Sequence, residues 1–143
     1  QLWRVNVMGM WSAARHAIPV MRDQGGGSIV NISSMAARLG HPMLGYKTTK
    51  TAVCALTENL ALANAGHGIR VNALCPGFFP AEQNRRVLDK SRVEASIDHT
   101  PMGRFGEAEE LIGATLLLAS DKAGSFITGS NLVVDGGFSV VTI

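Results

Sequence analysis

The stretch "IRVNALCPG", residues 69–77, combines alternating apolar and polar side chains with a stop at Pro76 and Gly77. An alternation of period two is typical of a β-strand, and a proline followed by glycine marks a turn. We therefore predict a strand over Ile69–Cys75. The preceding "NAGHG", residues 64–68, offers glycines that suit the left-handed conformation at the end of a helix.

Helices and strands are expected to alternate on both sides of this strand. The predicted segments are helices at about Val5–Met21 and Leu44–Ala65, a strand at Ser28–Ser33, an exposed helix or lid from Ala81 to about Ser96, a helix at Glu107–Ser120 and a last strand in "NLVVDGG", residues 131–137. This order is typical of an α/β protein with a parallel sheet. The three predicted strands, with about four helices, would form a small sheet with an uncovered edge. We therefore expect the sequence to be part of a larger domain.

The composition limits the classes of function. With 143 residues and 46% hydrophobic content, the chain can form one domain with a buried core. A net charge of +2 and a charged fraction of 17% provide no basic surface for nucleic acid, which favours small molecules or other subunits as partners. No apolar stretch approaches the roughly 20 residues of a membrane span, so we expect a soluble, cytoplasmic protein. Cys54 and Cys75 lack metal-ligand spacing and are interpreted as reduced core residues, with no metal site.

The segment "GYKTTK", residues 45–50, places Tyr46 and Lys50 four positions apart at the start of a predicted helix. Residues at this spacing lie on one helix face, with Cβ atoms roughly 5 to 6 Å apart. A nearby ammonium stabilises a phenolate, so the pair can act as a tuned acid and base. The structural alternative is that Tyr46 packs at the helix start while Lys50 points to water.

Five segments in order resemble the short-chain dehydrogenase/reductase family over essentially the whole chain. They are "VNVMG" at 5–9, "GGGSIVNISS" at 25–34, "YKTTK" at 46–50, "IRVNALCPG" at 69–77 and the tail from "TPMGRFG" to "VVDGG" at 100–137. The resemblance implies the C-terminal part of a Rossmann-type, doubly wound parallel sheet. It also implies hydride transfer between a nicotinamide cofactor, NAD or NADP, and a carbonyl or alcohol carbon.

The same resemblance implies the residues that do the chemistry. Tyr46 would be the general acid in reduction and the base in oxidation, and Lys50 would lower its pKa. Ser34 would hold the substrate oxygen beside the phenol. Asn6 would keep a water in a proton relay.

The implied cofactor contacts lie beside these residues. Lys50 would also bind the nicotinamide ribose next to Tyr46. Pro76, Gly77 and the backbone near Phe79 would pass under the nicotinamide. The residues that choose between NAD and NADP follow the second strand of such folds, and no matching segment occurs here.

Three features depart from the family pattern. The spacing from Ser34 to Tyr46 is one residue short, so Ser33 is the alternative to Ser34. Ala81 stands where many relatives have a cofactor-binding threonine. The Gly-rich phosphate loop is absent, because the triplet at 25–27 precedes a strand and is interpreted as a turn. We therefore expect on the order of a hundred further residues upstream, and no turnover by these 143 residues alone.

Within the family, the segments "PGFFPAEQNRR" at 76–86 and "TPMGRFGEAEELIGA" at 100–114 resemble gluconate 5-dehydrogenases and mannonate-type oxidoreductases. This resemblance favours a sugar acid or its keto form as substrate. An arginine such as Arg85 would pair with the carboxylate, unless it belongs to a solvated helix face. The enzyme alternative is a 3-oxoacyl-carrier-protein reductase, for which a basic patch would bind the acidic carrier.

Two alternatives come from other classes of protein. A non-catalytic dinucleotide-binding or scaffold protein would share the fold. A hydrolase would need Ser33 or Ser34 beside a histidine, but the sequence has no G-x-S-x-G and its histidines are scattered, which favours surface or helix-end roles for them.

The remaining conspicuous residues are interpreted as structural. Asn72 and Asp135 are expected to satisfy backbone groups at turns and strand ends, and Trp3 and Trp11 to lie in the core or at subunit contacts. Relatives assemble through helices that correspond to 5–21 and 44–65 and through the last strand. The resemblance therefore implies a homo-oligomer, a tetramer or a dimer.

Overall fold

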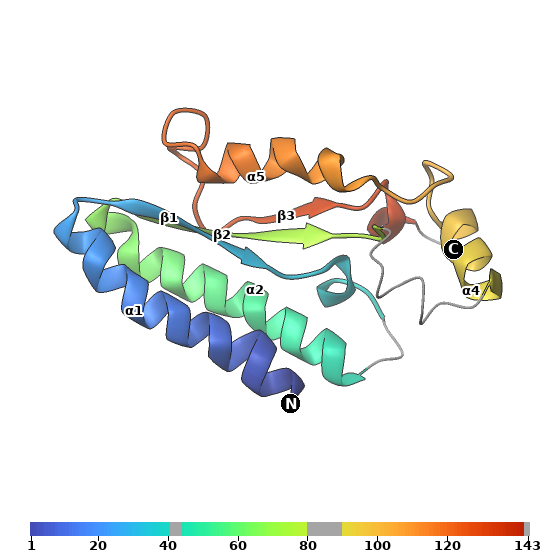
Figure 1. Ribbon diagram of the computed structural model, residues 1–143, viewed down its shortest axis with the longest axis horizontal. Coiled ribbons are helices and arrows are strands. Elements are labelled where there is room, and N and C mark those ends of the chain that lie inside the picture. The colour runs from blue at the N-terminus through green and yellow to red at the C-terminus, as the bar shows by residue number, and fades with distance from the viewer. Residues whose placement is uncertain (41–43, 80–89, 142–143) are drawn as a thin grey trace.

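The computed structural model describes residues 1–40, 44–79 and 90–141 (Figure 1). Its helices are a π-helical turn η1 (Arg4–Met8), α1 (Gly9–Asp23), α2 (Leu44–Asn64), α4 (Lys90–His99) and α5 (Ile112–Ala119), with short 3-10 turns at Met35–Ala37, Ala65–His67, Ala108–Leu111 and Phe138–Val140. Its strands are β1 (Gly27–Ile32), β2 (Ile69–Pro76) and β3 (Asn131–Val134). The three strands form one parallel sheet in the order β1-β2-β3. The predicted α/β fold class is therefore confirmed.

The sheet is covered on both faces. In Figure 1, α1 and α2 lie against one face and α5 against the other. The middle strand β2 is buried along its first seven residues. This double cover explains why β2 carries so many apolar side chains, as central strands of parallel sheets do. The main core cluster joins α1, α2 and β2 through Ala14, Ile18, Ala61, Ile69 and Val71.

Two buried polar side chains on β2 hydrogen-bond to the segment that connects α5 to β3. The guanidinium of Arg70 donates to the backbone oxygens of Leu118, Ala119 and Ser120 at the end of α5. The amide of Asn72 donates to Ile127 O and accepts from Ser130 N. Because a buried polar group is costly unless it is hydrogen-bonded, these bonds fix the connection from α5 to β3.

The structural reading of Asn72 is thus confirmed, and the same holds for Asp135. Its two carboxylate oxygens accept from the backbone N–H groups of Gly137 and Ser139 just after β3. The glycine triplet is also confirmed as a turn that leads into β1. Gly26 has φ 152°, and a Cβ there would lie 2.8 Å from Gly68 O, so only glycine fits.

The other predicted elements occur with small changes of boundary. The helix predicted over Glu107–Ser120 is divided into the 3-10 turn Ala108–Leu111 and α5. The predicted exposed helix from Ala81 is seen as α4 at 90–99, and its first nine residues lie outside the described residues. No helix in the described part of the chain is long and apolar enough to cross a membrane.

Trp3 and Trp11 were expected in the core or at subunit contacts, and the core alternative is excluded, because they are 51% and 41% exposed. His16, His67 and His99 are exposed, as expected for surface positions. His41 lies outside the described residues.

Candidate active site

The predicted site residues lie where β1 ends and α2 begins. β1 leads into the pair Ser33 and Ser34, and the first turns of α2 carry Tyr46 and Lys50. Ligands of open α/β sheets bind outside the carboxyl ends of the strands. The fold therefore brings these residues to the edge of the sheet where such sites are found.

Tyr46 and Lys50 face one another, as their spacing predicts. Lys50 Nζ lies 5.7 Å from the centre of the Tyr46 ring. Tyr46 is half-buried and Lys50 is 8% exposed, so the alternative in which Lys50 points to water is wrong. The Nζ group donates to Ile32 O at 2.9 Å, which links α2 to the end of β1.

The charge of Lys50 is held in a desolvated place. Burial lowers the pKa of its ammonium from the ordinary 10.5, and the nearby cysteines Cys75 and Cys54 only partly oppose this shift. Among the described residues, the salt bridges are Arg70–Asp121 and Arg104–Glu110, so Lys50 has no carboxylate partner there. A cation with this surrounding is costly for folding, and such groups are frequent at functional sites.

Asn6 reaches the same helix turn from η1. Its Nδ2 donates to Thr49 Oγ1 at 3.1 Å, and Thr49 Oγ1 donates to Tyr46 O at 2.8 Å. Asn6 is therefore two hydrogen bonds from the backbone of Tyr46. It lies in the single π-helical turn of the first helix, a feature that often accompanies functional sites.

The two serines after β1 have different surroundings. Ser33 Oγ donates to Lys50 O at 2.8 Å and lies 3.2 Å from Cys54 Sγ. Ser34 Oγ accepts from Ala36 N at 3.2 Å and caps the 3-10 turn Met35–Ala37. The Ser33 hydroxyl is thus turned into the interior against α2, whereas the Ser34 hydroxyl keeps its hydrogen for another acceptor.

The segment predicted to pass under a nicotinamide follows β2. Gly77 N donates to Val134 O, and a Cβ on Gly77 would lie 2.7 Å from the Cα of Asp135. Glycine at 77 therefore lets the ends of β2 and β3 approach closely. Ala81, which replaces the expected threonine, lies outside the described residues, as do Arg85 and Arg86.

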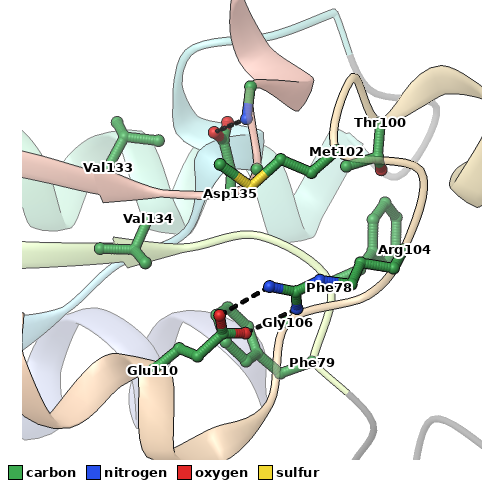
Figure 2. Close-up of a pocket in the computed structure, with 12 residues that line it drawn as sticks. Phe78, Phe79, Thr100, Met102, Arg104, Gly106, Glu110, Val133, Val134 and Asp135 are labelled. Atoms are coloured by element: carbon green, nitrogen blue, oxygen red, sulfur yellow. Dashed lines mark hydrogen bonds and ion pairs between the residues drawn. The ribbon is translucent and has the colours of Figure 1, made fainter.

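A cavity of about 380 Å³ lies beyond the ends of β2 and β3 (Figure 2). Figure 2 shows Phe79 against Gly106 and the ion pair of Arg104 with Glu110 at its rim. The side chains that line it include none of Asn6, Ser34, Tyr46 and Lys50. The cavity thus adjoins the predicted cofactor segment and does not include the predicted acid and base.

Sequence reasoning missed two members of this neighbourhood. Thr49 connects Asn6 to Tyr46, and Cys54 contacts Ser33. Cys54 lies four residues after Lys50, a spacing that could have indicated a shared helix face. Thr49 is the residue next to Lys50 in the sequence. The reading of both cysteines as free is confirmed, but only Cys75 is a core residue, since Cys54 is half-buried.

Comparison with known proteins places the chain in a family. A family model described as enoyl-(acyl carrier protein) reductase matches residues 1–139. The chain belongs to the short-chain dehydrogenase/reductase family. This confirms the resemblance carried by the five segments, and the four predicted catalytic residues all lie within the matched range.

Individual members of the short-chain dehydrogenase/reductase family cover almost the whole chain. Galactitol 2-dehydrogenase (L-tagatose-forming) of Cereibacter sphaeroides is 42% identical over 98% of the chain and 56% of its own length. The 3-oxoacyl-[acyl-carrier-protein] reductase of Thermotoga maritima is 37% identical over 95% of the chain and 55% of its length.

A solved structure gives the same picture. The gluconate 5-dehydrogenase of Burkholderia cenocepacia, in complex with NADP and tartrate, is 38% identical, has a TM-score of 0.94 and covers 98% of this chain. The match takes in 55% of that protein. The chain therefore spans about half the length of the relatives that it matches.

Proposed function

We propose that the protein is an NAD(P)-dependent oxidoreductase that transfers a hydride between nicotinamide and a secondary alcohol or ketone. The observation that supports this most is the pairing of Tyr46 with a desolvated Lys50 one helical turn away. Desolvation of the Lys50 ammonium costs stability, and a structural lysine gains nothing from it. In an acid and base pair, the same desolvation shifts the pKa, which assists proton transfer. The family supplies the reaction class.

The residues present fit the nicotinamide end of a dinucleotide. Lys50 offers ammonium hydrogens at the carboxyl edge of the sheet, and the glycine at 77 brings backbone groups close to β3. The bound cofactor supplies the hydride in reduction and accepts it in oxidation. The motifs of this sequence do not include the residues that recognise the adenosine part of such a cofactor.

The chain's own residues then handle the proton. In reduction the Tyr46 hydroxyl gives its proton to the substrate oxygen, and the Lys50 ammonium stabilises the phenolate that remains. The Ser34 hydroxyl donates to the same oxygen and keeps it beside the phenol. Asn6 fixes the first turn of α2 through Thr49 and holds the water that returns the proton from solvent.

The assignment to Ser34 in place of Ser33 is supported by their bonds. The Ser33 hydroxyl is engaged by Lys50 O and Cys54 Sγ inside the protein. Toward the residues that the structure describes, Ser34 Oγ only accepts, for the cap of the next turn. A hydroxyl hydrogen that is left for substrate favours Ser34.

For the substrate we infer a sugar acid or keto-sugar acid. The gluconate 5-dehydrogenase and galactitol dehydrogenase relatives act, by their names, on a sugar acid and a polyol, and the former was solved with tartrate. The second candidate is a 3-oxoacyl-carrier-protein reductase, which the Thermotoga maritima relative supports.

We also infer that the protein acts in the cytoplasm as a homodimer or homotetramer. Large apolar side chains are exposed on the first helix and on α2, which fits a surface that meets another subunit. They are Leu2, Trp3, Val5, Met8, Trp11, Val20, Leu44 and Leu62.

The deciding experiment follows nicotinamide absorbance in the full-length natural protein, wild type against Tyr46→Phe. Both cofactors are offered with sugar acids, polyols and 3-oxoacyl thioesters. We expect oxidation of a sugar acid that falls about 100-fold or more in the variant, because the general acid and base is lost. Activity on thioesters alone would support the carrier-protein reductase. Dinucleotide binding without turnover on any substrate would overturn the enzyme and leave a binding module.

A further inference from the structure

Two free thiols meet between α2 and β2, outside the residues used so far. Cys75 is fully buried near the end of β2, and Cys54 lies on α2 one turn after Lys50. Cys54 Sγ lies 3.2 Å from Ser33 Oγ, and Ser33 N donates to Leu74 O at 2.8 Å, next to Cys75. Ser33 therefore brings the two reduced sulfurs close together on neighbouring elements, and each sulfur influences the pKa of the other.

Only one of the two thiols can be reached from outside. Cys54 forms part of the wall of an open cavity of about 430 Å³, next to Arg38 and Glu58. Cys75 is absent from this lining and has no exposed surface. A small hydroperoxide in the cavity would therefore meet the sulfur of Cys54 first.

The contacts also divide the proton unequally between the sulfurs. The hydrogen bond from Cys75 lowers the pKa of Cys54 to about 6, with help from Ser33 and Arg38, against the opposing effects of burial and Glu58. The same bond raises the pKa of the Cys75 thiol. The thiolate is the nucleophilic form of cysteine, so the lowered pKa makes the reachable sulfur the more reactive of the two.

We propose that Cys54 and Cys75 are a redox-active pair, in which Cys54 reacts with a hydroperoxide and Cys75 then closes a disulfide between α2 and β2. In the first step the Cys54 sulfur attacks the peroxide, so an S–O bond forms and the O–O bond breaks. The leaving oxygen takes the thiol proton and departs as water from hydrogen peroxide, or as an alcohol from an organic hydroperoxide. In the second step the Cys75 sulfur, losing its proton, displaces the hydroxyl from Cys54 as water. Two thiols are oxidised and one peroxide is reduced.

The disulfide would act on both neighbouring segments. Ser33 has one hydroxyl hydrogen for two acceptors, Lys50 O and Cys54 Sγ, so loss of the thiolate shifts that hydrogen fully to the helix backbone. The bond also ties the helix turn after Lys50 to the residue before Pro76. Oxidation thus fixes the relative position of the start of α2 and the end of β2.

The test uses the full-length natural protein with hydrogen peroxide, followed by alkylation, unfolding and peptide mass spectrometry. We expect the peptides of Cys54 and Cys75 to be joined, lighter by two hydrogens and resistant to alkylation until reduced. The exposed Met102, whose side chain is 69% exposed, is the internal comparator. Sulfoxide at Met102 while both cysteines stay free would overturn the proposal, and so would a disulfide between two copies of the chain.

Two variants separate the roles of the sulfurs. Cys75→Ser is expected to stop at a sulfenic acid on Cys54 that dimedone traps, whereas Cys54→Ser leaves Cys75 reduced. Sulfenic acid on Cys75 in the second variant would contradict the assigned order of attack.

A measurement on the wild type covers the case in which a variant fails to fold. Iodoacetamide should alkylate Cys54 at least about 10-fold faster than Cys75 in the folded chain at neutral pH, and the difference should vanish in denaturant. Equal rates in the fold would overturn the proposal. None of these readouts needs a cofactor or a substrate, so their failure is distinct from failure of the proposed reaction.

Discussion

Two cations at the same end of the sheet are treated in opposite ways. Lys50, which lies on α2 against the end of β1, is 8% exposed, and burial lowers its pKa. Arg104, beside the cavity of Figure 2, is half-exposed and makes two 2.7 Å bonds to the carboxylate of Glu110. Those bonds raise the pKa of Arg104.

The difference teaches how to tell a functional charge from a structural one. Arg104 is paired in solvent, where such a pair adds little to stability and needs no further explanation. Lys50 gives up water for one backbone oxygen, Ile32 O, and folding gains nothing from that exchange. A charge that the fold holds at a cost is the better candidate for chemistry.

Replacing Lys50 with methionine tests the contrast between Lys50 and Arg104 most directly. Lys50→Met keeps the length of the side chain and removes its charge, so the proposed activity should fall about 100-fold or more. The free energy of unfolding should stay equal or rise by about 1 kcal/mol, because a desolvated charge is gone. Absorbance assays and urea unfolding of the full-length natural protein measure the two effects.

The pH dependence of unfolding sharpens the same prediction. The pKa of Lys50 is lower in the fold than its ordinary 10.5, so the unfolded chain binds the proton more readily. The cost of Lys50 to stability is therefore present at neutral pH and is relieved as pH rises through the folded pKa toward 10.5. Lys50→Met should lack this rise. Arg104→Met is the matched control, and a similar loss of activity there would refute the contrast.

A second prediction concerns the close packing on the cavity side. Gly77→Ala places a Cβ 2.7 Å from the Cα of Asp135, where backbone has to move. We expect a loss of about 1 to 3 kcal/mol in the free energy of unfolding, measured with urea. Gly113→Ala in α5 is the control, because nothing lies within 4 Å of its added Cβ and alanine favours helix. Equal effects at both sites would show that the two strand ends are not tightly held.

A third prediction separates the two serines. Ser33→Ala removes the bond to Lys50 O, so we expect about 1 kcal/mol lower stability and a modest effect on turnover. Ser34→Ala should leave stability nearly unchanged and lower turnover, as loss of a substrate contact does. The reverse result, with turnover lost in Ser33→Ala alone, would move the catalytic role to Ser33.

The sequence was sufficient for much of this fold because its signals are local. The alternation in 69–75 and the glycines at 66 and 68 define β2 and the end of α2 within one residue. The division of Glu107–Ser120 was missed, since the capping box of Glu107 with Glu110 permits either a 3-10 or an α-helical first turn. The choice between core and subunit contact for Trp3 and Trp11 stayed open, because apolar content alone does not say which face is covered, and the structure shows both exposed.

The candidate site was predictable where spacing decides contact. Tyr46 and Lys50 meet because four residues make about one turn of helix. The contact of Cys54 with Cys75 joins a helix to a strand, and only the tertiary packing of α2 on β2 creates it. The roles of Asn6 and Ser34 remain predictions, as do the contacts of Pro76 and Phe79 with a nicotinamide.

The smallest expected effect concerns the exposed ion pair of Arg104 with Glu110. Arg104 and the backbone N–H of Glu107 hold the pKa of Glu110 at about 2, below its ordinary 4.5. The unfolded chain therefore takes up this proton first, so the contribution of Glu110 is present above pH 4.5 and is lost as pH falls toward 2. Urea midpoints of wild type and Glu110→Gln should converge over this window, by a small amount because water screens the pair. Parallel curves with no convergence would mean that the Arg104 pair adds nothing to stability. The cavity rim would then be held by its backbone hydrogen bonds, from Gly106 N to Phe78 O and from Met102 N to Gly136 O, and by the contact of Phe78 with Phe105.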